Sequence, residues 1–156
     1  MRHWLFKTEP DTFSIDDLKN APKKTEMWDG IRNYQARNLL RDEVKKGDEV
    51  FIYHSSCKVP AIVGIAKVVK AGYVDPTQFD PEKKYYDPKA NPDNPRWYCV
   101  DIKYASTFKT PIPLKELKAN PALAGMKLLQ KGVRLSILPV SHHEWETILD
   151  TAGVAT

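Results

Sequence analysis

Two neighbouring runs rich in β-branched and aromatic residues constrain the fold of this chain more than any other feature. They are EVFIYH at 49–54 and AIVGIAKVVKAGY at 61–73, and only SSCKVP separates them. Such residues favour strands, and Gly64 inside the second run predicts a bulge or a close approach by another group. Further strands are predicted at 3–9, at 97–108 and at 134–140, where Pro139 indicates a sheet edge or a strand end.

Short helices are predicted between the strands. SIDDLKNA has Ser14 as N-cap and Asp17 at the capping-box position. From 33 to 46 the apolar residues fall on one helical stripe, and Gly47 suits a left-handed terminator. SHHEWETILDTAG carries an S-x-x-E capping box, an apolar stripe and a closing glycine, and LKELK and MKLLQKG predict short helical turns. Strands scattered between short helices indicate one mixed α+β domain over residues 1–156, with a small curved or closed sheet.

Composition and charge fit a soluble globular protein and leave its partner open. Of the 156 residues, 42% are hydrophobic and 28% are charged, and the net charge of +4 permits a polyanionic partner without requiring one. Cys57 and Cys99 lack CxxC spacing, which favours two free thiols over a disulfide. The N-terminus is too short and polar for a signal peptide, and no apolar run reaches membrane length. These features predict a cytoplasmic protein, or a nuclear one in a eukaryote, with no membrane partner.

Patterns for metal, cofactor and nucleophile sites are weak. The four histidines show no ligand spacing with the cysteines, so no metal is predicted. No glycine pattern for phosphates or dinucleotides occurs, so no cofactor is predicted. Cys57 follows His54 by three residues and would point to the opposite face. Lys7, Thr8 and Glu9 allow a hydrolytic trio, although strand alternation would also place Lys7 beside Glu9 as a plain ion pair.

The segment WDGIRNYQ holds more stacking and hydrogen-bonding side chains than the start of a helix needs. Trp28 here and Trp97 in a later loop both stand at loop edges beside polar residues. A base held between two aromatic faces gains about 1–3 kcal/mol per stacking contact. Asp29 could accept from an exocyclic amine, and Asn33 or Gln35 could pair with an amide edge. Core packing is the alternative for each tryptophan, and the residues alone indicate a pocket for a flat polar ligand.

Two further stretches have both a structural and a functional interpretation. The proline-rich stretch 75–97 is predicted to be a long ordered loop, because its four aromatic residues require burial. Arg37, Arg41 and Lys45 recur every four residues on the predicted helix. This basic stripe is either a solvated helix face or a contact for phosphates, which would carry no sequence information.

The ordered sequence blocks resemble those of the EVE domain family, which belongs to the PUA-like superfamily. The blocks are WLFKTEP, SIDDL, WDGIRNYQARNLLR, GDEVFIYHSS, PAIVGIAKVVK, DPTQFDP, YYDP, NPRWYCVDIKY and RLSILPV. The resemblance implies a small β-barrel ringed by short helices, with a ligand pocket at one mouth. It also implies kinship with the YTH domains, which hold a methylated adenine in an aromatic cage. EVE members are thought to recognise modified bases, including modified cytosines in DNA.

On this resemblance the chain is predicted to be a monomeric reader that binds DNA or RNA through one extruded, modified base, such as a modified cytosine or adenine. Trp28 resembles the first cage tryptophan, and Trp97 or Tyr86 would form the second wall. The predicted pocket residues are Trp28, Asp29, Asn33, Tyr34, Gln35, Ser55, Trp97 and Tyr86. The predicted phosphate contacts are Lys7, Arg32 and Arg37. The alternatives are a small hydrolase of modified nucleosides, similar to the related ASCH domains and using the 7–9 trio, and a scaffold module with an inert pocket.

Overall fold

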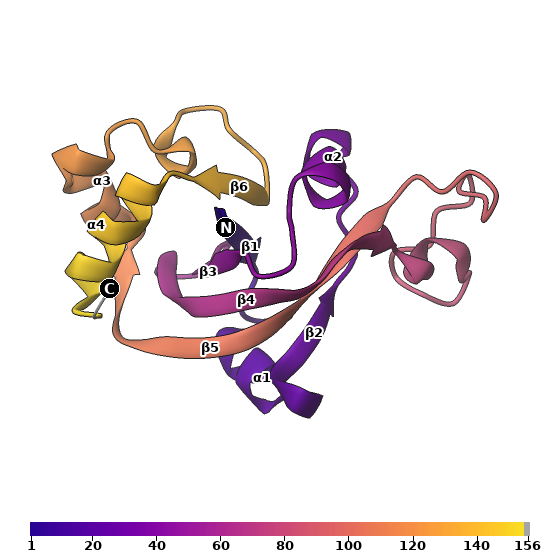
Figure 1. Cartoon of the computed structure of the whole chain (residues 1–156), viewed down its shortest axis with the longest axis horizontal. Helices are drawn as coiled ribbons and strands as arrows, with labels where there is room; N and C mark the ends of the chain where they lie inside the picture. The colour runs from indigo at the N-terminus through magenta and orange to yellow at the C-terminus, as the bar shows by residue number, and fades with distance from the viewer. Residues whose placement is uncertain (155–156) are drawn as a thin grey trace.

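An open sheet of six strands organises the fold in this computed structural model, which describes residues 1–154 (Figure 1). The strand order is β2-β5-β4-β3-β1-β6, with β1 and β3 parallel and the other neighbours antiparallel. The strands are β1 His3–Thr8, β2 Thr25–Trp28, β3 Glu49–His54, β4 Ala61–Val74, β5 Tyr98–Pro113 and β6 Ile137–Val140.

The mixed α+β class is confirmed, whereas the predicted closure of the sheet into a barrel is wrong. The order ends in β2 on one side and β6 on the other, and these two strands do not pair within residues 1–154. Each of these edge strands is only four residues long, and closure requires continuous pairing around the sheet. The alternative of a curved sheet fits, because register shifts bend the long β4–β5 ribbon (Figure 1).

In the described part of the chain, four short α-helices and four 3-10 segments flank the sheet. The α-helices are α1 Ile15–Asn20, α2 Tyr34–Asp42, α3 Leu114–Ala119 and α4 His142–Ala152, and the 3-10 segments are η1 Pro22–Lys24, η2 Pro76–Phe79, η3 Pro121–Leu123 and η4 Lys127–Leu129. Both predicted capping boxes form, Ser14 with Asp17 and Ser141 with Glu144. No helix in residues 1–154 is long and apolar enough to cross a membrane.

Helix α2 ends at Asp42, earlier than the predicted end at residue 46. The carboxylate of buried Asp48 accepts hydrogen bonds from the Lys45 amide and from Nε1 of Trp4, both at 2.9 Å. A side-chain acceptor thus takes the amide that a longer helix would have paired with a carbonyl. The chain leaves the helix before Gly47 and enters β3.

Gly64 marks a bulge in β4, as its position in the sequence predicted. The pairing of β4 shifts register at this point against both β3 and β5. A methyl group added at Gly64 would lie 2.3 Å from the carbonyl oxygen of Ser106 and 2.3 Å from Cδ1 of Ile15. The missing side chain therefore lets β5 and α1 approach the strand closely.

Strand β2 was not predicted, and it changes the setting of Trp28. The sequence TEMW pairs antiparallel with β5, so that Trp28 lies opposite Val100 as the last residue of a strand. Its ring joins the core cluster on one face of the sheet, together with Trp4 and Phe6. The opposite face carries a second cluster that includes Trp145 of α4. Trp28 therefore lies at the end of an edge strand, and one side of its ring packs against the core.

The thiols and histidines form no metal site in residues 1–154. No group of three or more histidine, cysteine, aspartate or glutamate side chains there could hold a metal ion. Cys57 and Cys99 are free thiols, as predicted. Burial raises the pKa of Cys99 to about 12, so this thiol is protonated at neutral pH.

Half-buried His54 ties the end of β3 to the start of α1. Its Nε2 accepts a hydrogen bond from the Ile15 amide at 3.1 Å, so this nitrogen carries no proton. Burial lowers the pKa of His54 below its ordinary value of 6.5, against the opposing effect of Asp16. Because the unfolded state then binds the proton more readily, the stabilising contribution of His54 is complete above pH 6.5 and is lost as the pH falls.

When the pH falls from about 7 to about 5, the free energy of unfolding should decrease in both the native protein and the variant His54→Gln. We expect the decrease to be about 1 kcal/mol larger in the native protein. A glutamine oxygen can accept from the Ile15 amide without titrating. Urea unfolding at both pH values measures the difference. His143→Gln, at an exposed position of α4, is the matched control and should follow the native protein. Equal losses in the native protein and in His54→Gln would contradict the prediction.

Candidate functional site

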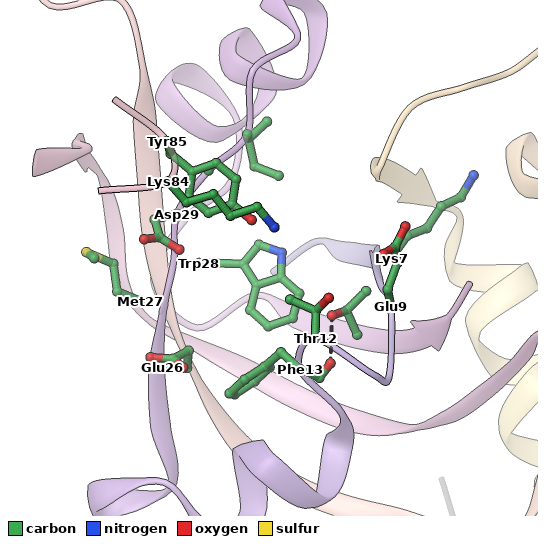
Figure 2. Close-up of a pocket in the computed structure, with 13 residues that line it drawn as sticks. Lys7, Glu9, Thr12, Phe13, Glu26, Met27, Trp28, Asp29, Lys84 and Tyr85 are labelled. Atoms are coloured by element: carbon green, nitrogen blue, oxygen red, sulfur yellow. Dashed lines mark hydrogen bonds between the residues drawn. The ribbon is translucent and has the colours of Figure 1, made fainter. Parts of the chain in front are cut away.

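A cavity of about 460 Å³ opens where the end of β1, the end of β2 and the loop after β4 meet (Figure 2). Its volume lies within the range of about 300–1,000 Å³ that is usual for small-ligand sites. The residues that line it are Lys7, Thr8, Glu9, Thr12, Phe13, Glu26, Met27, Trp28, Asp29, Gly30, Ile31, Lys84 and Tyr85. Trp28, Asp29 and Lys7 were predicted as site residues, and the structure brings these three together.

The indole of Trp28 lies in the middle of the cavity lining. It packs against Phe6 with ring centroids 5.9 Å apart and meets the edge of Phe13 at 5.9 Å. Its Nε1 donates no hydrogen bond to residues 1–154, yet no buried side-chain nitrogen or oxygen in that span lacks a partner. The indole N–H therefore opens toward the cavity, as its orientation in Figure 2 also shows.

Tyr85 is a third aromatic side chain of the cavity lining, besides Trp28 and Phe13. Its ring lies against the backbone of Gly30, where an added methyl group would come within 2.5 Å of the ring. Gly30 also has φ +78°, a conformation that a residue with a side chain adopts only with strain. Figure 2 shows Tyr85 and Lys84 on one side of the Trp28 indole, with Phe13 and Thr12 on the other.

Arg32 holds the Tyr85 segment in place. Its guanidinium donates to the Tyr85 carbonyl at 2.7 Å and 3.3 Å, to Oδ2 of Asp75 at 3.1 Å and to Oγ1 of Thr77 at 3.3 Å. A further bond reaches the carbonyl of Ile31 at 3.2 Å. The five N–H groups of an arginine side chain are thereby all engaged. The structure gives Arg32 the role of a structural clamp, and the predicted phosphate contact at this residue stays a prediction.

Asp75 is the fully buried acceptor at the centre of this clamp. Its Oδ2 accepts from the Gly30 amide at 3.0 Å and from Arg32, and its Oδ1 accepts from the amide of Thr77 at 2.8 Å and from its hydroxyl at 2.6 Å. Burial alone would raise the pKa of Asp75, but the hydrogen bonds from Thr77, Gly30 and Arg32 outweigh it and lower the pKa. The carboxylate therefore stays ionised and anchors both Gly30 and Arg32.

Asp29 and Glu26, two carboxyl groups of the cavity lining, lack side-chain donors of this kind in the described part of the chain. No side chain in residues 1–154 donates a hydrogen bond to Asp29 or Glu26. Burial raises the pKa of Asp29, with a further contribution from the charge of Asp75, and burial together with the charge of Asp29 raises the pKa of Glu26. Both carboxyl groups belong to the cavity lining and can accept hydrogen bonds from a flat ligand that offers amine or amide protons.

The residues Lys7, Thr8 and Glu9 line the cavity without forming the contacts that the sequence suggested. No ion pair joins Lys7 to Glu9 in the described residues, so the predicted pair is wrong. Burial lowers the pKa of Lys7. The Thr8 hydroxyl donates to the carbonyl of Phe13 at 2.7 Å, which directs its proton away from both neighbours. A hydrolytic trio would need that proton to pass to Lys7 or Glu9, and no contact of this kind favours the hydrolase alternative.

Trp97 does not line the cavity, so the structure does not bring it together with Trp28 as the predicted sandwich would require. The Trp97 ring is 6% exposed and stacks on Tyr34 at 4.8 Å, while its Nε1 donates to Asp87 at 2.7 Å. Tyr86, the other candidate for the second wall, is 39% exposed and also lies outside the lining. The lining contains Tyr85, the neighbour of the predicted Tyr86.

The remaining predicted residues also lie outside the cavity lining, and most have structural contacts. Asn33 is the N-cap of α2, and its Oδ1 accepts from the Ala36 amide at 3.0 Å. Arg37 donates to the Arg96 carbonyl at 2.9 Å and lies over the Tyr34 ring. The amide of Ser55 donates to the carbonyl of Thr8 at 2.9 Å, and Gln35 is exposed on the helix. None of these residues belongs to the cavity lining, and the contacts of Asn33, Arg37 and Ser55 stabilise the neighbouring segments.

Several lining residues gave no usable sequence signal. They are Thr12, Phe13, Glu26, Met27, Lys84 and Tyr85. The first two follow a strand-ending proline, and the last two lie in a loop more than 50 residues from Trp28. The tyrosine pair YY was the one local hint, because two aromatic residues in a polar loop call for burial.

The fold and the cavity together define a small α+β domain with a ligand-sized pocket between a tryptophan and a tyrosine. Residues 2–151 match the EVE domain family, so the chain belongs to that family, as its sequence blocks predicted. Thymocyte nuclear protein 1 from Homo sapiens is 45% identical over 163 residues, which cover 94% of this chain and 72% of that protein.

Solved structures agree with this assignment. The crystal structure of human THYN1 in complex with 5-methylcytosine-containing DNA superposes with a TM-score of 0.92 at 42% identity, covering 100% of both chains. A protein from Pseudomonas syringae superposes with a TM-score of 0.91 at 47% identity, covering 96% of this chain and 99% of that one. The mixed α+β fold is therefore shared across these proteins.

Proposed function

We propose that this protein is a reader of modified DNA that binds one extruded 5-methylcytosine in the cavity around Trp28. The observation that carries the proposal is that one aromatic cavity is lined both by an open indole N–H and by carboxyl groups without side-chain donors among the described residues, in a chain closely similar to human THYN1. Such a reader acts by binding and carries out no reaction. It is expected where the DNA is, in the nucleus of a eukaryote or the cytoplasm of a bacterium.

The edge of cytosine complements the groups that line the cavity. The exocyclic amine of cytosine is a donor that a carboxylate accepts, and Asp29 offers an acceptor next to Trp28. The ring nitrogen and carbonyl oxygen of the same edge can accept from the Trp28 N–H. Tyr85 and Trp28 supply aromatic surface for the ring and its methyl group. Extruding the base requires a few kcal/mol, which these contacts must offset.

The test compares four DNA duplexes that differ at one position, carrying cytosine, 5-methylcytosine, thymine or an abasic site. We expect 5-methylcytosine to bind about fourfold more tightly than cytosine, since burying one methyl group contributes about 0.8 kcal/mol. Thymine carries the same methyl group but presents a carbonyl to Asp29, so it should bind more weakly than 5-methylcytosine. Fluorescence anisotropy at fixed salt measures all four affinities. Equal affinity for cytosine and 5-methylcytosine would falsify the proposal.

A further inference from the structure

A second group of side chains, outside the cavity lining, converges on Tyr104 of β5. The ammonium group of Lys19, at the end of α1, lies 5.9 Å from the ring centroid of Tyr104, and that of Lys24 lies 5.6 Å from the same centroid. The Tyr104 ring packs against the core, and its hydroxyl shares a hydrogen bond of 2.8 Å with Thr107. The aromatic ring is therefore a fixed platform that gathers two positive charges.

Neither charge of this lysine–tyrosine patch (Lys19, Lys24 and Tyr104) is neutralised within the described residues. Ion pairs in residues 1–154 involve neither lysine, and both side chains are exposed. The nearby Asp17 carboxylate is occupied by the capping box of α1. Two ammonium groups repel one another, so a site that brings them together is suited to an anion that bridges them.

The backbone that carries Lys24 is strained. Lys23 and Lys24 have φ of 56° and 55°, two consecutive left-handed residues that are not glycine. Each such residue costs about 1–2 kcal/mol, and strain of this kind persists where the surrounding structure or function requires it. The Thr25 hydroxyl donates to the Lys23 carbonyl at 3.0 Å and holds this turn. This turn precedes β2, and the ammonium group of Lys24 lies over the Tyr104 ring, as that of Lys19 does.

Strand β2 connects this patch directly to the cavity. It begins at Thr25, next to Lys24, and ends three residues later at Trp28 (Figure 1). Three residues of strand span about 10 Å, which equals the rise of about three base-pair steps along the axis of a DNA duplex, at 3.4 Å per step. We propose that the lysine–tyrosine patch binds phosphates of the DNA strand that flank the extruded base. This proposal rests on the proposed function, because the position of the DNA strand over the patch follows from the binding of the extruded base in the cavity.

The test measures DNA affinity of the double variant Lys19→Gln/Lys24→Gln between about 50 and 200 mM salt. Loss of two phosphate contacts should reduce the slope of log affinity against log salt by about 1.8, because each contact contributes about 0.9. The ratio of affinities for 5-methylcytosine and cytosine should stay unchanged, since phosphates carry no sequence information. Glutamine keeps the side-chain length and removes only the charge, and Lys19→Arg/Lys24→Arg should retain the native slope.

Lys115→Gln/Lys118→Gln on α3 is the matched control, since it removes the same charge from another part of the surface, and it should leave the slope native. A native slope in Lys19→Gln/Lys24→Gln, or an equal reduction in both double variants, would overturn the proposal. The two hypotheses fail differently. A reduced slope with no preference for 5-methylcytosine keeps the patch and rejects the reader, whereas a native slope with that preference intact rejects the patch alone.

Discussion

We expect Trp28→Ala to abolish the preference for 5-methylcytosine and to lower affinity for the methylated duplex by about 30- to 1,000-fold. The stacking contact contributes about 1–3 kcal/mol and the indole N–H about 1 kcal/mol more, and alanine removes both. The ring also belongs to the core, where it is 8% exposed and packs against Phe6 and Phe13. The same change should therefore reduce the free energy of unfolding by about 3–5 kcal/mol.

Trp28→Phe separates binding from folding. Phenylalanine keeps most of the aromatic surface, so the variant should remain folded, but it lacks the N–H that opens toward the cavity. We expect about a fivefold weaker complex, since one hydrogen bond contributes about 1 kcal/mol. Trp97→Phe is the matched control: it loses a hydrogen bond to Asp87 outside the cavity and should keep the native preference. If Trp97→Phe weakened the complex and Trp28→Phe did not, the base would bind elsewhere.

The features that could be predicted from the sequence are those that depend on neighbours along the chain. The capping boxes of α1 and α4 need only two residues three positions apart, and both form. The bulge at Gly64 follows from a glycine inside a β-branched run. Strand β2 was missed because its four residues, TEMW, are stabilised by pairing with β5, more than 70 positions later.

The site was predicted in part because its two walls differ in how they are built. Trp28 and Asp29 stand out locally, as aromatic and acidic residues beside a glycine. Tyr85 reaches the cavity through the bonds of Arg32 to its carbonyl and to Asp75, at sequence separations of 53 and 43 residues. The polar residues after Trp28 looked like reading groups, but two of them have structural roles: Arg32 clamps the loop and Asn33 caps a helix. A pattern of residue types does not distinguish a side chain that faces a ligand from one that completes the fold.

The clamp itself gives the second large effect, which Asp75→Asn measures. The two oxygens of Asp75 each accept two hydrogen bonds, from Gly30 and Arg32 on one side and from Thr77 on the other. An asparagine must turn its NH2 group toward one of these pairs of donors, and it leaves the Arg32 guanidinium without its counter-charge. Breaking a buried charge pair in this way costs about 3–5 kcal/mol, and urea unfolding should show a loss of that size.

Asp75→Asn should also weaken binding of the methylated duplex under conditions where the variant is folded. The reason is positional: Asp75 touches no ligand, but it anchors Gly30 under the Tyr85 ring and Arg32 on the Tyr85 carbonyl. Asp80→Asn is the control, since Asp80 accepts only from the exposed Glu82 amide and an amide oxygen can replace it, so stability should change by about 0.5 kcal/mol or less. A loss below about 1 kcal/mol in Asp75→Asn would mean that the loop has other anchors. A large loss of stability with native affinity for 5-methylcytosine would instead separate the clamp from the pocket, and Tyr85 would no longer count as its second wall.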